Sequence, residues 1–351
     1  MERTLARLGL IHIRRRRKKI RFFPFHPFHP FYHPVALMAY NPKPNAIFHF
    51  SLFTFHFSLL PLRSTLNYLL HHPLARRTPL YTLLHYAYWQ ISTRVQAQPL
   101  VVSWIGGTRL WFQRNWLGIS GNLYTGLHEF AEMAFVLHLL RPGDCFVDVG
   151  ANMGSYTLLA SGVCGAYTYS FEPHPDTFQR LVANIQLNQL RTHCHAHRAA
   201  LGAYTGTAYL RQSARDTQHH IASTPSADTL EVRIHALDEV VPPPCQLLKI
   251  DVGGFEYAVL QGAQQHLQNP ELLAVLVELN GQGQRYQHSD QAVHDRLLEA
   301  GFQAYRYDPF KRTLERMEGF EGQNTLYVRD VARVRERVET AKKRKVLNQW
   351  V

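Results

Sequence analysis

Acidic residues are almost absent from the first third of this 351-residue chain. After Glu2 the next acid is Glu129, whereas residues 129–330 hold 23 acids against 15 lysines and arginines. The net charge of +12 therefore belongs to the two ends of the chain and does not describe its middle. A basic total would suggest nucleic acid or an anionic membrane as partner. Because the middle segment is acidic, we do not expect a nucleic-acid partner.

Cysteine is also scarce, with only four in the chain and no C-x-x-C pair. The sequence thus lacks the disulfide framework of small secreted domains and the usual zinc motifs. We expect reduced thiols and a cytoplasmic location. His193, His195 and His197 alternate along one predicted strand, yet no acid or cysteine stands at ligand spacing. We therefore expect no metal site there.

The first 65 residues show no pattern typical of a folded domain. A basic run at 14–19 is followed by "FFPFHPFHPFYHP" at 22–34. Proline at this density blocks helices and central strands. Residues 45–62 are uncharged, but they contain Pro61 and are short for a membrane span. We predict a poorly ordered extension over 1–65, with membrane contact through this basic segment as the less favoured alternative.

Residues 141–330 alternate between strand-like and helix-like segments, which is typical of a parallel sheet with helices on both faces. The predicted strands are 145–149, 166–172, 192–200, 247–252, 272–279, 302–308 and 324–330, and the predicted helices begin near 155 or cover 176–188, 255–267 and 290–300. After Gly202 the pattern indicates a β-rich excursion. We assign 66–140 to an N-terminal cap with two short strands and a helix at 125–140. Residues 331–351 form a basic tail, predicted as a solvated helix.

The segment "CFVDVGANMG" carries the clearest binding signal in the chain. Parallel sheets bind ligands at the carboxyl ends of their strands, and Asp148 lies near such an end. Gly150 and Gly154 allow a tight turn and a close approach of the backbone to a ligand. Glu172 ends the next strand, 22 residues after Gly150, where an acid commonly binds ribose hydroxyls. The pocket should therefore hold a ribonucleoside with a group attached.

The turn has one glycine fewer than the G-x-G-x-x-G motif of dinucleotide sites. An acid beside free backbone N–H groups can bind both the ammonium and the carboxylate of a zwitterionic amino acid. The same acid would repel a pyrophosphate. This favours S-adenosylmethionine as the cofactor. Another nucleotide-dependent Rossmann enzyme remains an alternative.

Five blocks in order resemble the FkbM-type S-adenosylmethionine-dependent methyltransferases. They are "FVDVGANMGSYTLLAS", "FEPHPDTFQRLVANIQLN", "ALGAYTG", "LLKIDVGGFEYAVLQGA" and "LVELN". The resemblance implies a class I methyltransferase fold, Rossmann-like, with a mostly parallel seven-stranded sheet and an antiparallel last strand. It also implies O-methylation of a hydroxyl on a sugar, polyketide or other small metabolite.

The same resemblance assigns the site residues. The cofactor contacts are Asp148, Gly150, Asn152, Gly154 and Glu172, and Asp251 is the expected catalytic residue. The chain departs from the family pattern at Gly253, where the pattern has a glutamate. A cofactor-binding protein with impaired catalysis is therefore an alternative. Lys249 and Asp251 share one face of a strand, so a purely structural ion pair is another interpretation.

Overall fold

The computed structural model describes residues 59–96, 98–114, 116–213, 219–222 and 224–351. Most of the predicted extension, residues 1–58, lies outside this part of the chain, as do the basic run and most of the uncharged stretch. The predicted boundary at residue 65 falls inside helix α2 (Leu59–His71). Residues 59–65 are therefore helical, whereas the prediction placed them in a poorly ordered extension. Helix α2 packs through Leu69, which is 1% exposed.

The centre of the domain is an eight-stranded sheet in the order β13-β12-β14-β11-β10-β3-β4-β5. Its strands are β3 (Cys145–Val149), β4 (Tyr167–Phe171), β5 (Cys194–His197), β10 (Leu247–Ile250), β11 (Ala274–Glu278), β12 (Gln303–Asp308), β13 (Thr313–Arg316) and β14 (Asn324–Val328). Strands β5, β4, β3, β10 and β11 are parallel, and β14 runs antiparallel between β11 and β12. The seven expected strands and the antiparallel last strand are confirmed.

The eighth strand, β13, forms a hairpin with β12 at one edge of the sheet. Three of its four residues are exposed. An exposed polar strand has no apolar face to bury, so it carries no alternating pattern that the sequence could reveal.

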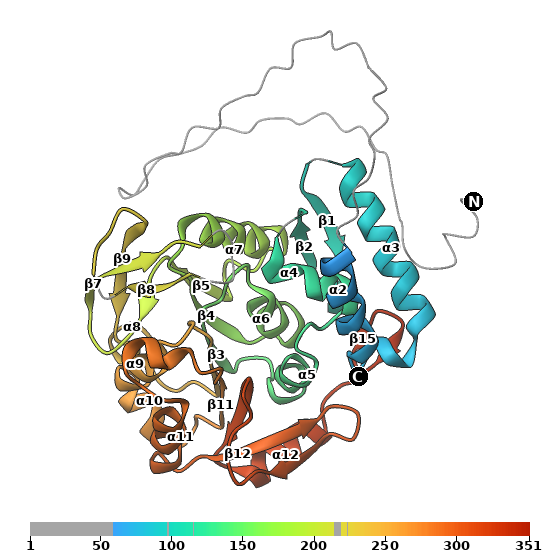
Figure 1. The fold of residues 1–351 in the computed structure, drawn as a ribbon. Helices are drawn as coiled ribbons and strands as arrows, with labels where there is room; N and C mark the ends of the chain where they lie inside the picture. The colour runs from blue at the N-terminus through green and yellow to red at the C-terminus, as the bar shows by residue number, and fades with distance from the viewer. Residues whose placement is uncertain (1–58, 97, 115, 214–218, 223) are drawn as a thin grey trace, which may run out of the picture. The chain divides into compact units, whose positions relative to one another are not determined.

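Helices cover both faces of the sheet, as Figure 1 shows. One face packs on α5 (Phe130–Leu139), α6 (Ser155–Thr157), the following π-helix (Leu158–Cys164) and α12 (Val331–Glu339). The other face packs on α8 (Leu237–Val240), α9 (Glu256–Gln261), α10 (Gln264–Gln268) and α11 (Asp290–Glu299). Along β3, Phe146 joins the first core and Val147 and Val149 join the second. This alternation places Asp148 on the face of Phe146, where it accepts a hydrogen bond from Thr157 of α6.

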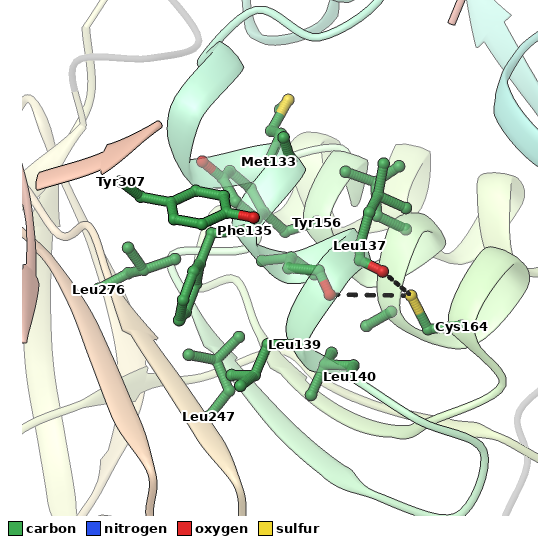
Figure 2. Close-up of a cluster of buried hydrophobic side chains, with 14 of the residues drawn as sticks. Met133, Phe135, Leu137, Leu139, Leu140, Tyr156, Cys164, Leu247, Leu276 and Tyr307 are labelled. Atoms are coloured by element: carbon green, nitrogen blue, oxygen red, sulfur yellow. Dashed lines mark hydrogen bonds between the residues drawn. The ribbon is translucent and has the colours of Figure 1, made fainter. Parts of the chain in front are cut away.

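Helix α5 is the apolar centre of the first face (Figure 2). Its residues 133–139 are all buried, although a surface helix would be apolar on one side only. Figure 2 shows Cys164 with its thiol directed at two carbonyl groups of α5, at 3.8 Å each. The helix predicted at 125–140 is shorter in the structure, where α5 begins at Phe130 and a separate helix, α4 (Leu117–Thr125), ends just before Gly126. The break lies at Gly126, which has φ 83° and whose carbonyl oxygen accepts a hydrogen bond from the Trp104 indole at 2.7 Å.

Three smaller sheets complete the fold. Strands β1 (Leu100–Ser103) and β2 (Arg109–Phe112) form the predicted hairpin. The β-rich excursion is a four-stranded sheet of β6 (Ala200–Leu201), β9 (Thr229–His235), β7 (Gly206–Arg211) and β8 (His220–Ala222). Strands β15 (Lys345–Val346) and β16 (Gln349–Trp350) pair near the C-terminus. The remaining helical segments are η1 (Ala75–Arg77), α3 (Pro79–Val95), η2 (Ile105–Gly107), α7 (Pro175–Leu187) and η4 (Gln282–Tyr286).

The basic tail is not a solvated helix. Val334 and Val338 of α12, and Val346 after it, are fully buried in the core of the first face. Arg337 donates to Asp144 at 2.5 Å and ties α12 to the start of β3. The prediction missed this because the apolar residues of α12 are sparse among its charges. The division into a cap at 66–140, a main domain at 141–330 and a tail at 331–351 remains a proposal.

None of the helices in the described part of the chain has the length and apolar content that a membrane-spanning helix needs.

Candidate active site

A cavity of about 920 Å³ opens at the carboxyl ends of β3, β4, β10 and β11. Its walls are completed by the α4–α5 segment and by β7 and β8 of the smaller sheet. Small-molecule sites typically measure ~300–1,000 Å³. The cavity is therefore large enough for a cofactor and a small acceptor side by side.

The turn after β3 forms one wall of this cavity. The N–H groups of Gly150 and Ala151 both donate to the carbonyl of Phe171 at the end of β4, at 3.0 and 2.9 Å. Gly150 has φ 78°, and a Cβ atom placed on it would lie 1.9 Å from the carbonyl oxygen of Asp251. Only glycine fits this position, since the turn after β3 lies directly against the loop after β10.

Asn152 and Glu172 meet across the same wall. The Glu172 carboxylate accepts from the N–H of Asn152 at 3.1 Å and from the N–H of His174 at 2.8 Å. Asn152 itself has φ 49°, in the left-handed region that asparagine tolerates. Burial raises the pKa of Glu172 to about 7. Glu172 thus fixes the turn and still presents carboxylate lone pairs at the cavity wall.

Two of the predicted cofactor residues lie behind the wall. Asp148 is fully buried, and its Oδ2 accepts from the Thr157 hydroxyl at 2.8 Å. Its Oδ1 has no hydrogen-bond partner among the described residues, and burial raises its pKa. Gly154 has φ 88°, and a Cβ there would lie 2.6 Å from Leu181 of α7. Of the five predicted contacts, the structure brings Gly150, Asn152 and Glu172 to the cavity, whereas Asp148 and Gly154 support the turn.

The predicted catalytic residue lines the opposite wall, as part of a charged group. Asp251 lies 3.0 Å from the buried ammonium of Lys249, and its side chain is 36% exposed. Lys249 also lies over the ring of Tyr156, 4.9 Å from the centroid. The predicted Lys249–Asp251 ion pair is therefore present. It does not remove Asp251 from the cavity, because the remaining carboxylate surface is open.

Glu278, at the end of β11, is a second carboxyl group beside Asp251. Burial and the negative charge of Asp251 together raise the pKa of Glu278 to about 8. Both residues line the cavity. The negative charge of Asp251 therefore favours the protonated form of Glu278.

Glu129 and Tyr156 extend this group toward α5. The Tyr156 hydroxyl donates to Glu129 at 2.6 Å, and the Asn324 side-chain amide donates to the other Glu129 oxygen at 2.8 Å. Both Glu129 and Tyr156 line the cavity. The sequence analysis missed Glu129, Tyr156 and Glu278 as site residues. The one available signal was the position of Glu129, the first acid after a long acid-free stretch.

Gly253 lies at the rim, in the loop after β10. It has φ 64° and no atom closer than 3.5 Å to a Cβ placed on it. Its carbonyl accepts from the guanidinium of Arg285 at 3.0 Å. Glu256, at the start of α9, is buried and accepts from the N–H groups of Val252 and Gly254. Glu256 therefore holds the loop and does not line the cavity.

The three alternating histidines stack on the neighbouring strand. His193 stacks on Tyr167, His195 on Tyr169 and His197 on Phe171, with centroid distances of 4.8–5.3 Å. Among the described residues no group of three histidine, cysteine or acidic side chains is placed to hold a metal ion.

The sequence of this region matches a known family. Residues 148–304 match the profile described as the methyltransferase FkbM domain. Residues 148–304 are therefore similar to an FkbM methyltransferase domain. The match covers β3 to β12, which are the elements that form most of the cavity.

Relatives of the FkbM domain include one curated enzyme and several solved structures. The hexuronic acid methyltransferase AglP of Haloferax volcanii is 29% identical over 143 residues, which are 39% of this chain and 56% of that protein. This chain thus spans little more than half the length of that relative. The methyltransferase FkbM from Methylobacillus flagellatus is 16% identical with a TM-score of 0.38, over 59% of this chain and 53% of the other. The M. capricolum TrmK, in complex with S-adenosylhomocysteine, is 7% identical with a TM-score of 0.32, over 56% and 66%.

S-adenosylmethionine is the cofactor of the FkbM domain, and the residues of the cavity fit it. The glycine cradle at Gly150 leaves room for a ligand close to the backbone. Glu172 offers acceptors where ribose hydroxyls are expected. The acids Asp251 and Glu129 line the cavity and favour an ammonium and a sulfonium there.

Proposed function

We propose that this chain transfers a methyl group from S-adenosylmethionine to a hydroxyl of a sugar, with hexuronic acid derivatives as the leading acceptor class. The proposal rests on one observation above the others. The glycine turn that receives the cofactor touches the backbone of Asp251, so a carboxylate stands at the junction of the cofactor wall and the open part of the cavity. The name of the relative AglP supports the choice of acceptor.

The bound cofactor supplies an electrophilic methyl group for in-line displacement by the acceptor oxygen. The protein's contribution is alignment and exclusion of water. Gly150, Asn152 and Glu172 bind and orient the cofactor. Asp148 and Gly154 keep the turn in shape from behind.

We propose Asp251 as the catalytic residue that orients the acceptor hydroxyl and accepts its proton. Lys249 holds the carboxylate by donating to its Oδ2, and Asp251 lines the cavity. Glu278 lies next to Asp251, and its raised pKa lets it hold a proton beside that carboxylate. A base placed in this way contributes about 10²–10⁴-fold to the rate.

Arg285 supports an acidic acceptor. It lines the cavity at the Gly253 rim, where the family pattern has a glutamate and this chain has none. Because Gly253 supplies no carboxylate to neutralise the nearby Arg285 guanidinium, an acceptor with an anionic group is favoured there.

The experiment measures methyl transfer from isotope-labelled S-adenosylmethionine to matched sugars by mass spectrometry. One arm offers glucuronic and galacturonic acid glycosides, and the other offers the corresponding neutral hexosides. We expect transfer to the uronic acids, less transfer to the neutral sugars, and a reversal of this preference in Arg285→Glu. Binding of S-adenosylmethionine, measured by calorimetry with NAD as the control, should be the same in the variant. Binding without transfer to any sugar would contradict the proposed acceptor, and binding of NAD alone would contradict the cofactor.

A further inference from the structure

Helix α3 carries large apolar side chains on its outer surface. Leu80, Leu84, Ile91 and Val95 are 70%, 63%, 64% and 83% exposed. Single exposed apolar residues are ordinary on protein surfaces, whereas a continuous apolar strip marks a binding surface. The arrangement of these four residues along the helix is therefore informative.

The four residues form one strip. At ~100° per residue, positions 80, 84, 91 and 95 fall within about 60° of one another around the helix axis. The opposite side of α3 buries Thr82 and His85 instead. The His85 ring is hydrogen-bonded to the carbonyl of Leu123 at 2.9 Å, which satisfies this polar side chain where it is buried. The inner side also carries Trp89, which packs on Phe112, and Tyr86, which packs on Tyr124. Helix α3 therefore has large apolar or aromatic side chains on its outer side as well as its inner side.

The surroundings of the strip are strongly basic. Residues 59–128 contain six arginines and no acid, and residues 341–351 contain four basic residues and no acid. These two segments meet at the start of α3, where the Gln349 side chain donates to the carbonyl of Leu74 at 2.8 Å and to the Thr78 hydroxyl at 3.2 Å. The exposed basic residues of the two segments include Arg76, Arg77, Arg94, Lys342, Lys343 and Lys345.

Trp350 adds an interfacial residue at the same end of α3. It is 64% exposed and pairs with Lys345 across β15 and β16. Tryptophan has an apolar ring with one polar N–H group, which suits the boundary between water and hydrocarbon. The strip, the exposed cations and this indole are the features of a helix that lies in a membrane surface.

We propose that the outer strip of α3, together with the β15–β16 hairpin, binds the surface of a membrane that contains anionic lipids. Leu80, Leu84, Ile91 and Val95 enter the boundary between headgroups and acyl chains. The arginines and lysines contact the anionic headgroups. This surface lies outside the cavity and is independent of the proposed methyl transfer.

A second copy of the chain fits this face less well. Two copies packed strip to strip would bring the arginines and lysines of one surface against those of the other. Neither segment supplies an acid to neutralise them. An anionic lipid surface neutralises all of them at once.

The test is flotation of the full chain with vesicles of phosphatidylcholine alone and with vesicles of equimolar phosphatidylcholine and phosphatidylglycerol. We expect binding to the anionic vesicles, with binding that falls as salt rises. The double variant Leu84→Asp with Ile91→Asp should lose roughly tenfold or more of the vesicle affinity. The matched control is Tyr204→Asp, which changes an exposed residue of 54% accessibility far from α3 in the sequence and should bind as the parent does.

A third variant, with Lys342, Lys343 and Lys345 all changed to Gln, separates the charge from the apolar contact. It should weaken binding to anionic vesicles and flatten the salt dependence, while the apolar strip is unchanged. Circular dichroism shows whether each variant is folded.

Three results would overturn the proposal. One is unchanged vesicle binding in the α3 double variant, which would move any membrane contact elsewhere in the chain. Another is a dimer that dissociates in the double variant, which would assign the strip to self-association. The third is a large loss of thermal stability in the double variant, which would show that another part of the chain covers the strip.

Discussion

Two walls of the cavity, the one formed by the turn after β3 and the opposite one that carries Asp251, are formed by different kinds of groups. The cofactor wall consists of backbone, with N–H groups of the β3 turn donated to the Phe171 carbonyl and to Glu172. The opposite wall consists of charged side chains from separate elements, namely Lys249, Asp251 and Glu278, with Tyr156 beside them. A backbone wall tolerates few substitutions, because its shape depends on conformations that only glycine or asparagine adopt easily. A side-chain wall can change its chemistry while the fold stays the same.

The strongest test of this contrast is Gly150→Ala beside Gly253→Ala. Both glycines have left-handed φ values, but a Cβ at Gly150 meets a carbonyl oxygen at 1.9 Å and a Cβ at Gly253 meets nothing closer than 3.5 Å. We expect Gly150→Ala to lower the free energy of unfolding by about 2–5 kcal/mol and to abolish cofactor binding. Gly253→Ala should cost only about 1–2 kcal/mol and keep cofactor affinity. Urea unfolding and calorimetry measure the two effects, and similar losses in both variants would contradict the contrast.

Asp251→Asn tests the chemistry of the opposite wall. We expect turnover to fall by about 10²–10⁴-fold, because the variant can no longer accept a proton at this position. Cofactor affinity should change little, since the cofactor wall is intact. Glu256→Gln is the control, because Glu256 is a buried acid of the same loop that does not line the cavity. If Asp251→Asn keeps full turnover, Glu278 or another group accepts the proton, and Glu278→Gln then becomes the decisive variant.

Glu172→Ala tests the cofactor wall through a side chain, because Glu172 both holds the turn after β3 and lines the cavity. We expect S-adenosylmethionine to bind more weakly by about 1.5–3 kcal/mol, the size of a hydrogen bond to a charged group. Asp176→Ala, an exposed acid at the start of α7, serves as the control. Calorimetry that finds equal affinity in parent and Glu172→Ala would remove Glu172 from the cofactor site.

The smallest expected effect is a dependence of stability on pH. Burial raises the pKa of Glu172 from 4.5 to about 7 in the folded chain. A carboxyl group with a raised folded-state pKa holds its proton more tightly when folded, so its contribution is complete below pH ~4.5 and is lost as the pH rises toward 7. We expect the free energy of unfolding without cofactor to fall by about 1–2 kcal/mol between pH 5 and pH 7 because of this group. In Glu172→Gln that part of the slope should disappear, and an identical slope in both proteins would assign it to other carboxyl groups.

The sequence could predict the cofactor wall better than the opposite wall. The glycine turn, Asn152 and Glu172 lie within one short stretch, so their spacing carries the information. Strand alternation also predicted that Asp148 and Phe146 share a face. Strand alternation could not predict that Asp148 is fully buried behind the cavity wall, because the Thr157 hydroxyl that donates to it comes from the next helix.

The opposite wall assembles residues from distant parts of the chain. Glu129 precedes α5, Tyr156 belongs to α6 and Glu278 ends β11, so no local pattern connects them. Local pattern failed elsewhere for similar reasons. Gly126 interrupts a run with helical spacing, and the buried valines of α12 are too few to stand out among charged neighbours.

The contact between Gly150 and the Asp251 carbonyl has a consequence for how the enzyme turns over. Two backbones this close cannot slide past each other, so the cofactor turn and the loop that carries Asp251 move as one rigid body. Opening of the cavity for exchange of ligands then falls to its other walls, the α4–α5 segment and the β7–β8 hairpin. We therefore expect the position of Asp251 relative to the cofactor turn to stay fixed while ligands enter and leave at the other walls.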